Sequence, residues 1–370
     1  MKIAYVAEWD AFGNSGVLTK IQAQITQWEK NGHEVKVFMI SSTSGDRKEL
    51  ADNFIVFFSN FMNKNKNGFV KKLFNRLFNG KKIFESVGEF SPNIIYYRQN
   101  SWYPFLIKTL NIAPSIMELN TDDLSEMRLF SFLKRNLYLL GREKIIHTCS
   151  AFVSVSNEIA TLYQKYGKPI KIISNGFDFS NFKTDKLVNF QKTDNYKPQL
   201  IFVGTPDMSW HGVDIYIKLA SLLPEFEFHL VGPVLQSTPT NVYQHGYLNQ
   251  NKLYDLYKSI DIGVGTLALF RKKMKEASPL KTREYAAFGL PMIVGYWDTD
   301  LHDFDSVLQI NTATLESEIN KTRKFIKIWS RKRVEVIRYS SILDYRIKEE
   351  KRLIFFKQII TNYANQKNQS

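Results

Sequence analysis

A sixteen-residue segment carries four charged side chains at spacings that suit a long anionic ligand. Residues 276–291, EASPLKTREYAAFGLP, place Glu276 and Glu284 eight positions apart, with Lys281 and Arg283 between them. On a helix that separation is about 10 Å along the axis, too far for two carboxylates to share a proton. Each carboxylate can instead accept from a pair of ring hydroxyls, and a cation between them suits an anion. A sugar, a diphosphate and a ribose in a row would match this order of groups.

The same segment has the start and stop signals of a helix. Ser278 is a favoured N-cap and Pro279 suits the first helical position, while a Gly-x-Pro exit ends the pattern, so we predict a helix from about 279 to 288. Counted from Ser278, Lys281 takes the third helical position, where the helix dipole favours an anion. A negative ligand held by Lys281 and by the backbone of residues 278–280 would explain the cation. The alternative is that Lys281 points into solvent, at a cost of a few tenths of a kcal/mol.

Two other loops have the composition of phosphate-binding turns. Near the N-terminus, Gly13 and Gly16 precede a predicted helix whose free backbone N–H groups could bind an anion, although a turn without a ligand explains them equally well. Further on, the run LIFVG ends at Gly204 and leads through Thr205 to His211, just ahead of another predicted helix. A lone histidine is more often a capped surface residue than a ligand contact, so only its neighbourhood favours a functional role.

The elements that must position these residues follow from the hydrophobic pattern. Short β-branched runs alternate with longer amphipathic segments, which predicts an α/β fold with parallel sheets covered by helices. In the first half, strands are expected at 2–7, 34–40, 54–58, 94–98, 115–119, 152–156 and 170–174. After a polar stretch at 176–198, the runs LIFVG, FHLVG, DIGVGTL and PMIVGY begin a second series. We therefore predict two doubly wound, Rossmann-like domains facing a cleft, which is the default ligand site.

Several enzyme classes lose their main sequence support. No G-x-G-x-x-G follows the first strand of either series, no P-loop motif occurs, and neither H-E-x-x-H nor G-x-S-x-G is present. These absences disfavour nicotinamide enzymes, P-loop nucleotidases, zincins and acyl hydrolases. The single cysteine, Cys149, excludes an intrachain disulfide. No apolar run is long enough to span a bilayer, and the start MKIAYVAEWD lacks a secretion signal, so we expect a cytoplasmic protein.

Charge is the strongest compositional signal. The formal net charge of +14 points to anionic partners. Residues 64–82 contain seven Lys or Arg and no acid, with Phe and Leu at helical spacing, which is the pattern of a basic amphipathic helix on an anionic membrane. The alternative is a surface helix whose apolar stripe packs on its own domain. A second basic zone spans 321–338, but neither zone carries a nucleic-acid-binding signature, so nucleic acid is disfavoured as a partner.

Four segments, in order along the chain, resemble one enzyme family. EASPLKTREYAAFGLP matches the E-x7-E element of retaining glycosyltransferases with the GT-B fold, of the family-4 type. ISNGFD at 173–178 resembles that family's I-x-N-G-[VI]-D, NGHEVKVF at 31–38 its G-H-E-V strand, and FVG followed by WHGVD the opening of its donor domain. The resemblance covers residues 1 to about 300. It implies transfer of a sugar from a nucleotide-diphosphate sugar to a glycan or lipid-linked acceptor in surface polysaccharide synthesis, with no cofactor and no metal.

The resemblance assigns roles to individual residues. Glu276 would lie beside the donor sugar as the catalytic carboxylate, and Glu284 would hold the ribose. Gly16 would close on the diphosphate from the first domain. The full set of donor-binding residues that we predict is Glu284, Lys281, Ser278, Pro279, Leu280, Gly16, Gly204, Thr205, His211 and Arg283.

One departure from the family pattern concerns the cations. Many members have Arg and Lys where this chain has Thr205 and His211. The charge of the diphosphate would then fall on Lys281, with help from Arg283 or Arg271.

The resemblance also implies a mechanism and an acceptor site. Such enzymes are thought to transfer the sugar with retention, by attack on the face that the leaving group departs from. The departing phosphate can take the acceptor's proton, so a protein base is not required. The acceptor would lie on the first domain, at the ends of two predicted strands. Its predicted contacts, each of which could also be an ordinary loop or cap residue, are Tyr97, Arg98, Glu118, Asn120 and Asp122.

Other interpretations stay open. Asp298-Thr299-Asp300 matches the metal-binding D-x-D motif of a different glycosyltransferase fold, but it follows the sheet-like run PMIVGYW, so we expect a loop and no metal. The chain could be a non-catalytic GT-B-like binding subunit or a basic scaffold. It could also be a nucleotide-sugar 2-epimerase, although no pair of titratable groups suggests one.

The predicted organisation has three parts. An acceptor domain spans 1–180 and a nucleotide-sugar donor domain spans 198–340. A C-terminal helix at 341–370 would cross back to the first domain. Because residues 64–82 suggest membrane docking, the acceptor would be carried by a lipid and the enzyme would be peripheral on the inner face of the membrane.

Overall fold

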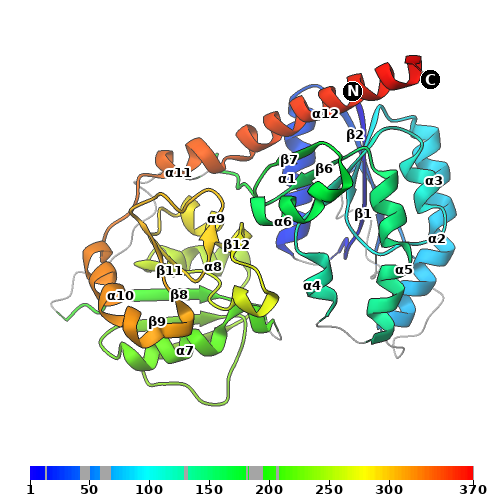
Figure 1. The fold of residues 1–370 in the computed structure, drawn as a ribbon. Helices are drawn as coiled ribbons and strands as arrows, with labels where there is room; N and C mark the ends of the chain where they lie inside the picture. Colours follow the sequence, from blue (N-terminus) through cyan, green and yellow to red (C-terminus); the bar gives the residue numbers. More distant parts are fainter. Residues whose placement is uncertain are drawn as a thin grey trace. The chain divides into compact units, whose positions relative to one another are not determined.

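The chain forms two compact units. The computed structural model describes residues 1–12, 15–41, 51–58, 68–128, 132–180, 182, 195–205 and 208–369. One unit is Met1–Ile173 with Glu349–Ser370, and the other is Ser174–Lys348. Each is built around a parallel sheet with helices on its faces (Figure 1), which confirms the predicted doubly wound α/β class. Among the described residues, no helix is long and apolar enough to cross a membrane.

The first unit contains a seven-stranded sheet in the order β3-β2-β1-β4-β5-β6-β7. Its strands, all parallel, are β1 Lys2–Glu8, β2 Glu34–Ile40, β3 Phe54–Phe57, β4 Ile94–Arg98, β5 Ser115–Leu119, β6 Ala151–Ser154 and β7 Ile170–Ile172. Runs of Val, Ile, Tyr and Phe suit these strands because most are covered on both faces. The strand order reverses between β1 and β4, and ligands of such sheets bind beyond the carboxyl ends at that point.

Helices cover both faces of this sheet. They are α1 Gly16–Lys30, α2 Gly68–Phe90, α3 Leu106–Leu110, α4 Asp123–Met127, α5 Phe132–Thr148, α6 Asn157–Tyr163 and α12 Tyr345–Gln369. On one face α1 and α12 share a core with the sheet, where Trp28 contacts the rings of Tyr96 and Phe356. On the other face Phe38 contacts Phe90 of α2, and α3 contacts both α2 and α5.

The second unit contains a six-stranded parallel sheet in the order β10-β9-β8-β11-β13-β15. Its strands are β8 Gln199–Val203, β9 Glu227–Val231, β10 Val242–Gly246, β11 Ile262–Val264, β13 Met292–Val294 and β15 Val307–Gln309, and a separate pair is formed by β12 Glu276–Ala277 and β14 Trp297–Asp298. Its helices are α7 Val213–Leu222, α8 Gln250–Tyr257, α9 Leu280–Ala287, α10 Leu315–Trp329 and α11 Val336–Leu343, with 3-10 turns η4 Ser209–His211 and η5 Leu269–Lys272. Here the order reverses between β8 and β11. The loops after these two strands therefore occupy the usual ligand position.

Candidate functional site

Helix α9 begins one residue later than predicted, and Ser278 is not its cap. The N-cap is Pro279, which makes no side-chain capping bond. The Ser278 Oγ instead accepts from the backbone N–H of Asn175 at 2.8 Å, and the Ser278 carbonyl accepts from Asn175 Nδ2 at 2.5 Å. The predicted capping role is therefore wrong, because this hydroxyl is committed to the loop after β7. Lys281 accordingly takes the second helical position rather than the third.

Lys281 does not point into solvent. Part of its side chain is exposed, but its Nζ is buried and has no hydrogen-bond partner among the described residues. The nearest feature is the Phe202 ring of β8, whose centroid lies 4.3 Å from Nζ. Burial lowers the pKa of Lys281 to about 7. An amine that has lost its hydration and gained no polar partner, at a helix end that disfavours cations, is in a position that an anion would stabilise.

His211 and Lys272 bring two more nitrogen donors to the same region. His211 Nδ1 accepts from the backbone N–H of Thr205 at 3.1 Å, so the neutral ring carries its proton on Nε2. Burial, followed by the charges of Lys281 and Lys272, lowers the pKa of His211 to about 3. Lys272 is only 7% exposed, and its ammonium lies 4.8 Å from the centre of the Trp210 ring. The loops after β8 and β11 thus present a positively charged lining at the reversal of strand order.

A glycine lets these two loops approach each other. Gly212, at the start of α7, has φ +78°, and a Cβ there would lie 2.8 Å from the backbone nitrogen of Ala268. Any side chain would strain the backbone and push the two loops apart. Gly204 directly follows β8, its N–H donates to Val231 O at 2.9 Å, and a Cβ there would lie 2.9 Å from the Phe202 ring of the same strand. The close approach of the two loops therefore depends on Gly212.

The two carboxylates of the segment differ in their surroundings. Glu284 lies on α9, and its Oε2 accepts from the Tyr257 hydroxyl at 2.7 Å. Burial raises the pKa of Glu284, and the hydrogen bonds from Tyr257 and Tyr254 oppose that rise. Glu276 lies in β12, opposite Trp297 of β14, and is 7% exposed. Glu284 is therefore oriented by tyrosines, which is suitable for accepting from ligand hydroxyls.

Arg283 has partners that the sequence did not suggest. It is fully buried, with NH1 2.5 Å from Asp298 Oδ2, NH2 2.7 Å from Asp300 Oδ2, and Nε donating to Asn175 O at 3.2 Å. Lys348 pairs with Asp300 as well, at 2.9 Å. The structure thus gives Arg283 a structural role in place of the predicted contact with a diphosphate. Asp298 was predicted to lie in a loop, but it belongs to β14. Asp298 and Asp300 of the D-x-D segment hold α9 in place through Arg283.

Arg271 is likewise committed to protein contacts. Its guanidinium makes a bidentate ion pair with the Asp214 carboxylate, with N–O distances of 2.9 and 2.6 Å. It also donates to Ser209 O at 2.7 Å. These bonds tie η5 to the start of α7. Of the cations that the sequence offered for a diphosphate, Lys281 is the one whose charged group has no such partner in the described chain.

In the first unit, the predicted acceptor residue Glu118 is fully buried in an ion-pair network. Its carboxylate lies 2.9 Å from Lys20 Nζ and 3.0 Å from Arg98 NH1, and it accepts from Asn120 Nδ2 at 3.0 Å. Burial alone would raise the pKa of Glu118, but the charges of Lys20, Arg98 and Arg352 outweigh it and hold the pKa well below its usual range. Glu118 therefore positions other side chains, whereas Arg98 and Asn120 keep part of their surface exposed.

The other first-unit candidates also have structural contacts. Tyr97 is 1% exposed, and its hydroxyl donates to Asn100 O at 3.0 Å. Asp122 is the N-cap of α4 and accepts from a backbone N–H of that helix. Gly16 is the exposed first residue of α1, whereas Gly13 lies outside the described residues. These candidates lie at the carboxyl ends of β4 and β5 and in the segment that follows β1.

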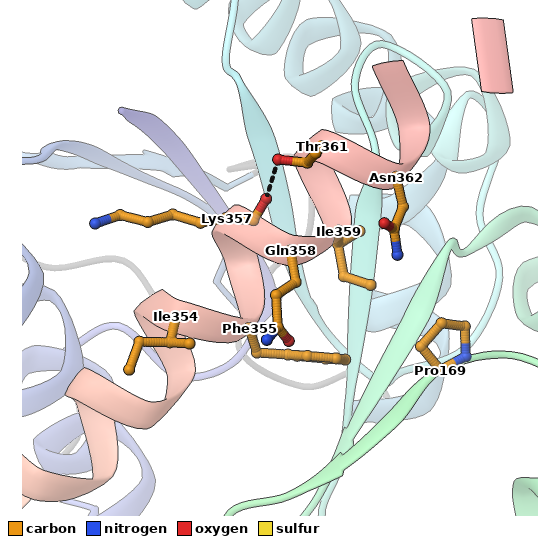
Figure 2. A pocket seen from close by; sticks show the side chains of 8 residues that line it. All are labelled: Pro169, Ile354, Phe355, Lys357, Gln358, Ile359, Thr361 and Asn362. Atoms are coloured by element: carbon orange, nitrogen blue, oxygen red, sulfur yellow. Dashed lines mark hydrogen bonds between the residues drawn. The ribbon is translucent and has the colours of Figure 1, made fainter. Parts of the chain in front are cut away.

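A pocket of about 570 Å³ lies elsewhere in the first unit, between Pro169 and one side of α12 (Figure 2). Figure 2 shows Phe355 and Ile359 beside the amides of Gln358 and Asn362. None of the predicted site residues lines this pocket. Its lining carries no carboxylate, so we assign it no part in the chemistry.

The arrangement of strands and helices has counterparts among solved structures. Over 98% of its length the chain matches 99% of sucrose-phosphate synthase from Thermosynechococcus elongatus, with a TM-score of 0.69 and 11% identity. The chain has the GT-B fold. GT-B counterparts also include a lipopolysaccharide outer core galactosyltransferase, matched over 96% of this chain and 100% of that one with a TM-score of 0.64 and 12% identity. A third is an α-glucosyltransferase in complex with UDP and DNA, matched over 96% and 100% with a TM-score of 0.63 and 14% identity. No protein-family model and no curated protein sequence matches the chain.

Three site residues of this GT-B chain were missed by sequence reasoning. Asn175 holds Ser278, and its signal was its place within the segment ISNGFD. Lys272 belongs to the basic run at 271–275, whose composition does not reveal which member is buried. Tyr257 orients Glu284 from α8, and no local pattern indicates that contact. Each of these residues contacts a residue far away in the sequence, and such contacts leave no local pattern.

Proposed function

We propose that the protein is a glycosyltransferase that takes a sugar from a nucleotide-diphosphate sugar bound by its second unit. The observation that carries this proposal is the buried, unpartnered amine of Lys281 at the start of α9, among the described residues. A diphosphate placed there would pair with the ammonium of Lys281. The Nε2–H of His211 could donate a hydrogen bond to it, and the ammonium of Lys272 would add positive charge. The GT-B fold supports the same class of donor, because one GT-B counterpart is a glucosyltransferase with bound UDP.

The carboxylates provide the remaining donor contacts in this proposal. Glu284, oriented by Tyr257, accepts from the ribose hydroxyls, and Glu276 accepts from hydroxyls of the sugar. The backbone of Ser278, Pro279 and Leu280 lies between the two carboxylates in sequence and would contact the sugar or the phosphates. Gly204 and Thr205 bring the loop after β8 to the same end of the sheet.

The chemical step needs little from the protein beyond charge stabilisation. The acceptor hydroxyl oxygen bonds to the anomeric carbon while the bond from that carbon to the donor phosphate oxygen breaks, and the hydroxyl proton passes to the departing phosphate. Attack on the face that the phosphate leaves retains the anomeric configuration. The cations stabilise the negative charge that develops on the leaving nucleoside diphosphate, which is the task a metal performs in other enzymes. We therefore propose retention without a metal.

We further propose that the acceptor is a lipid-linked or surface glycan bound by the first unit. Arg98, Asn120 and Asp122 have exposed surface at the carboxyl edge of its sheet, so they stay in the proposal, whereas the buried Glu118 does not. A lipopolysaccharide galactosyltransferase shares the fold, and the acid-free basic segment 64–82 suits a membrane-bound acceptor. Residues 64–67 of that segment lie outside the described residues. The protein would then work in the cytoplasm, on the inner face of the membrane.

A thermal-shift screen against a panel of nucleotide sugars tests the donor proposal. We expect one donor to raise the melting temperature at millimolar concentration, and incubation with that donor and extracted lipids to release its nucleoside diphosphate. If no nucleotide sugar shifts the melting temperature, the transferase proposal is wrong. Binding without release under any acceptor condition would favour a binding subunit, and isomerisation of the donor sugar would favour an epimerase.

A further inference from the structure

The first half of α2 buries polar residues and exposes apolar ones. Asn75 and Asn79 are 1% and 2% exposed, and Asn75 Nδ2 donates to Ser41 O at 3.1 Å. On the outward side, Leu77 is 48% exposed and Phe78 is 55% exposed. A helix whose outer surface faced only water would place these side chains the other way round. The explanation that the apolar stripe packs on its own domain therefore fails for Leu77 and Phe78.

Helix α5 exposes a longer apolar row. Phe132 and Leu140 are each 79% exposed, Leu133 is 61% exposed and Leu137 is 36% exposed. The spacing of residues 133, 137 and 140 places them on one helix face. The opposite face, which includes Tyr138, is buried against the unit. Four exposed apolar side chains within nine residues of one helix are typical of an interaction surface rather than of isolated surface residues.

The two apolar faces belong to the same layer of the first unit. Helix α3 contacts both α2 and α5 (Figure 1). Phe105, which precedes α3, meets Phe84 of α2 with ring centroids 5.9 Å apart. Both helices follow the carboxyl ends of parallel strands, β3 and β5, and run back along the sheet. The first half of each therefore lies towards the carboxyl edge, where the proposed acceptor contacts are.

Cations outnumber acids around these faces, where Glu85 on α2 and Glu143 on α5, one turn after Leu140, are each more than half exposed. The segments 68–84 and 128–142 contain no Asp or Glu. Lys82 on α2, Arg128 at the end of α4 and Arg135 on α5 are all exposed. Exposed Leu and Phe interleaved mainly with cations complement the interface of an anionic bilayer, where the apolar groups reach the acyl boundary and the cations meet the headgroups.

We propose that α2 and α5 together form a membrane-docking surface for anionic lipid, with Phe132, Leu133, Leu137 and Leu140 of α5 as its larger part. This inference rests on the proposed function, because docking at the carboxyl edge brings a lipid-linked acceptor to the first unit. It also assigns to α5 a role that the basic segment 64–82 alone does not supply. A protein partner that covered the same face would not discriminate between lipid headgroups.

Vesicle co-sedimentation of the full chain tests the surface. The vesicles are pure phosphatidylcholine, or phosphatidylcholine with phosphatidylglycerol at about one part in three. The variants are Phe132→Ser with Leu140→Ser on α5, Arg135→Glu on α5, and Leu77→Ser with Phe78→Ser on α2. Ile337→Ser on α11 is the matched control, because Ile337 is 68% exposed in the second unit.

We expect the wild type to bind the anionic vesicles at least about tenfold more strongly than the neutral ones. Both serine double variants and Arg135→Glu should lose about tenfold or more of that binding, whereas Ile337→Ser should bind like the wild type. All variants should keep the wild-type melting temperature and nucleotide-sugar binding, since none of these residues lies in the second-unit site. Equal binding to both vesicles, no binding to either, or wild-type binding by the α5 double variant would overturn the inference. None of these results changes the binding of a nucleotide sugar. A failure of the proposed function would instead appear as the absence of nucleotide-sugar binding by the wild type.

Discussion

Replacement of Lys281 by Met probes the proposed diphosphate site through two opposite effects. The substitution keeps a long flexible side chain and removes the amine. In the donor-free protein that amine destabilises the folded state, because it is buried over the Phe202 ring without a hydrogen-bond partner among the described residues. With a nucleotide sugar bound, the same amine becomes a charge partner. K281M should therefore stabilise the empty protein and weaken donor binding.

The stability effect depends on pH in a defined direction. The pKa of Lys281 falls from 10.5 to about 7 on folding, so the unfolded chain binds more protons between these values. Stability therefore rises with pH in this window, and the cost of the lysine grows as the pH falls from 10.5 to 7. Linkage places that cost at ~4 kcal/mol at pH 7 and ~1 kcal/mol near pH 10. Because the wild-type amine can relieve part of it by moving towards solvent, we expect K281M to raise the free energy of unfolding by about 2 kcal/mol at pH 7.

The binding effect should follow the protonation of the same amine. Burial sets the pKa of Lys281 to about 7 in the empty protein, and a bound diphosphate raises it. The dissociation constant of a nucleotide sugar should be flat below that pH and rise up to about tenfold per pH unit above it. K281M should bind about 30- to 100-fold more weakly at pH 6.5 and show no such slope.

Urea unfolding at pH 7 and 10 and calorimetric titration at about pH 6 to 9 measure both effects. Lys275→Met, on the exposed lysine just before Glu276, is the control and should change neither quantity appreciably. If K281M has the wild-type free energy of unfolding at both pH values and binds donor normally, the amine is not a desolvated phosphate ligand and the reasoning is wrong.

Three further substitutions test other parts of the second unit. Gly212→Ala should lower the free energy of unfolding by about 2 kcal/mol in urea titrations, because φ is +78° and a Cβ would meet the loop after β11; an unchanged midpoint would show that the loops can move apart. Asp298→Asn should cost about 3 to 5 kcal/mol in the same assay, since it removes a charge partner of the buried Arg283; a loss below about 1 kcal/mol would contradict the anchoring role. Tyr257→Phe should raise the dissociation constant for donor about three- to tenfold by releasing Glu284 from its 2.7 Å hydrogen bond, and wild-type affinity would argue against Glu284 as a ribose ligand.

The central strands of both sheets could be predicted because their sequences are apolar, rich in β-branched residues and buried. The bounds of β2, β4 and β5 match the predictions, and β1 extends only one residue further. Strands β10 and β15 were missed, since Val242–Gly246 and Val307–Gln309 are short edge strands with half-exposed residues and lack a long apolar run. The pair β12 and β14 was also missed, because two-residue strands exist only through their tertiary pairing.

The part of the candidate site that depends on neighbouring residues in the sequence could be predicted, whereas the contacts between residues far apart in the chain could not. The position of a lysine near a helix start is visible in the sequence, but its desolvation by Phe202 is not. The role of Ser278 was mistaken for a cap because its partner, Asn175, comes from another loop. Arg283 looked available for the same reason, since its carboxylate partners lie beyond the helix. On α2, the hydrophobic pattern identified the stripe but not the side on which it lies.

Calorimetric titration of the wild type and of Glu284→Gln with nucleotide sugars tests most directly the claim that the second unit binds such a donor along α9. The wild type should bind one donor molecule per chain, and Glu284→Gln should bind it about tenfold or more weakly, because an amide replaces a carboxylate that accepts from two hydroxyls. The melting temperature of Glu284→Gln should stay close to that of the wild type. If no nucleotide sugar binds the wild type, or if both proteins bind the same donor equally well, the account is contradicted.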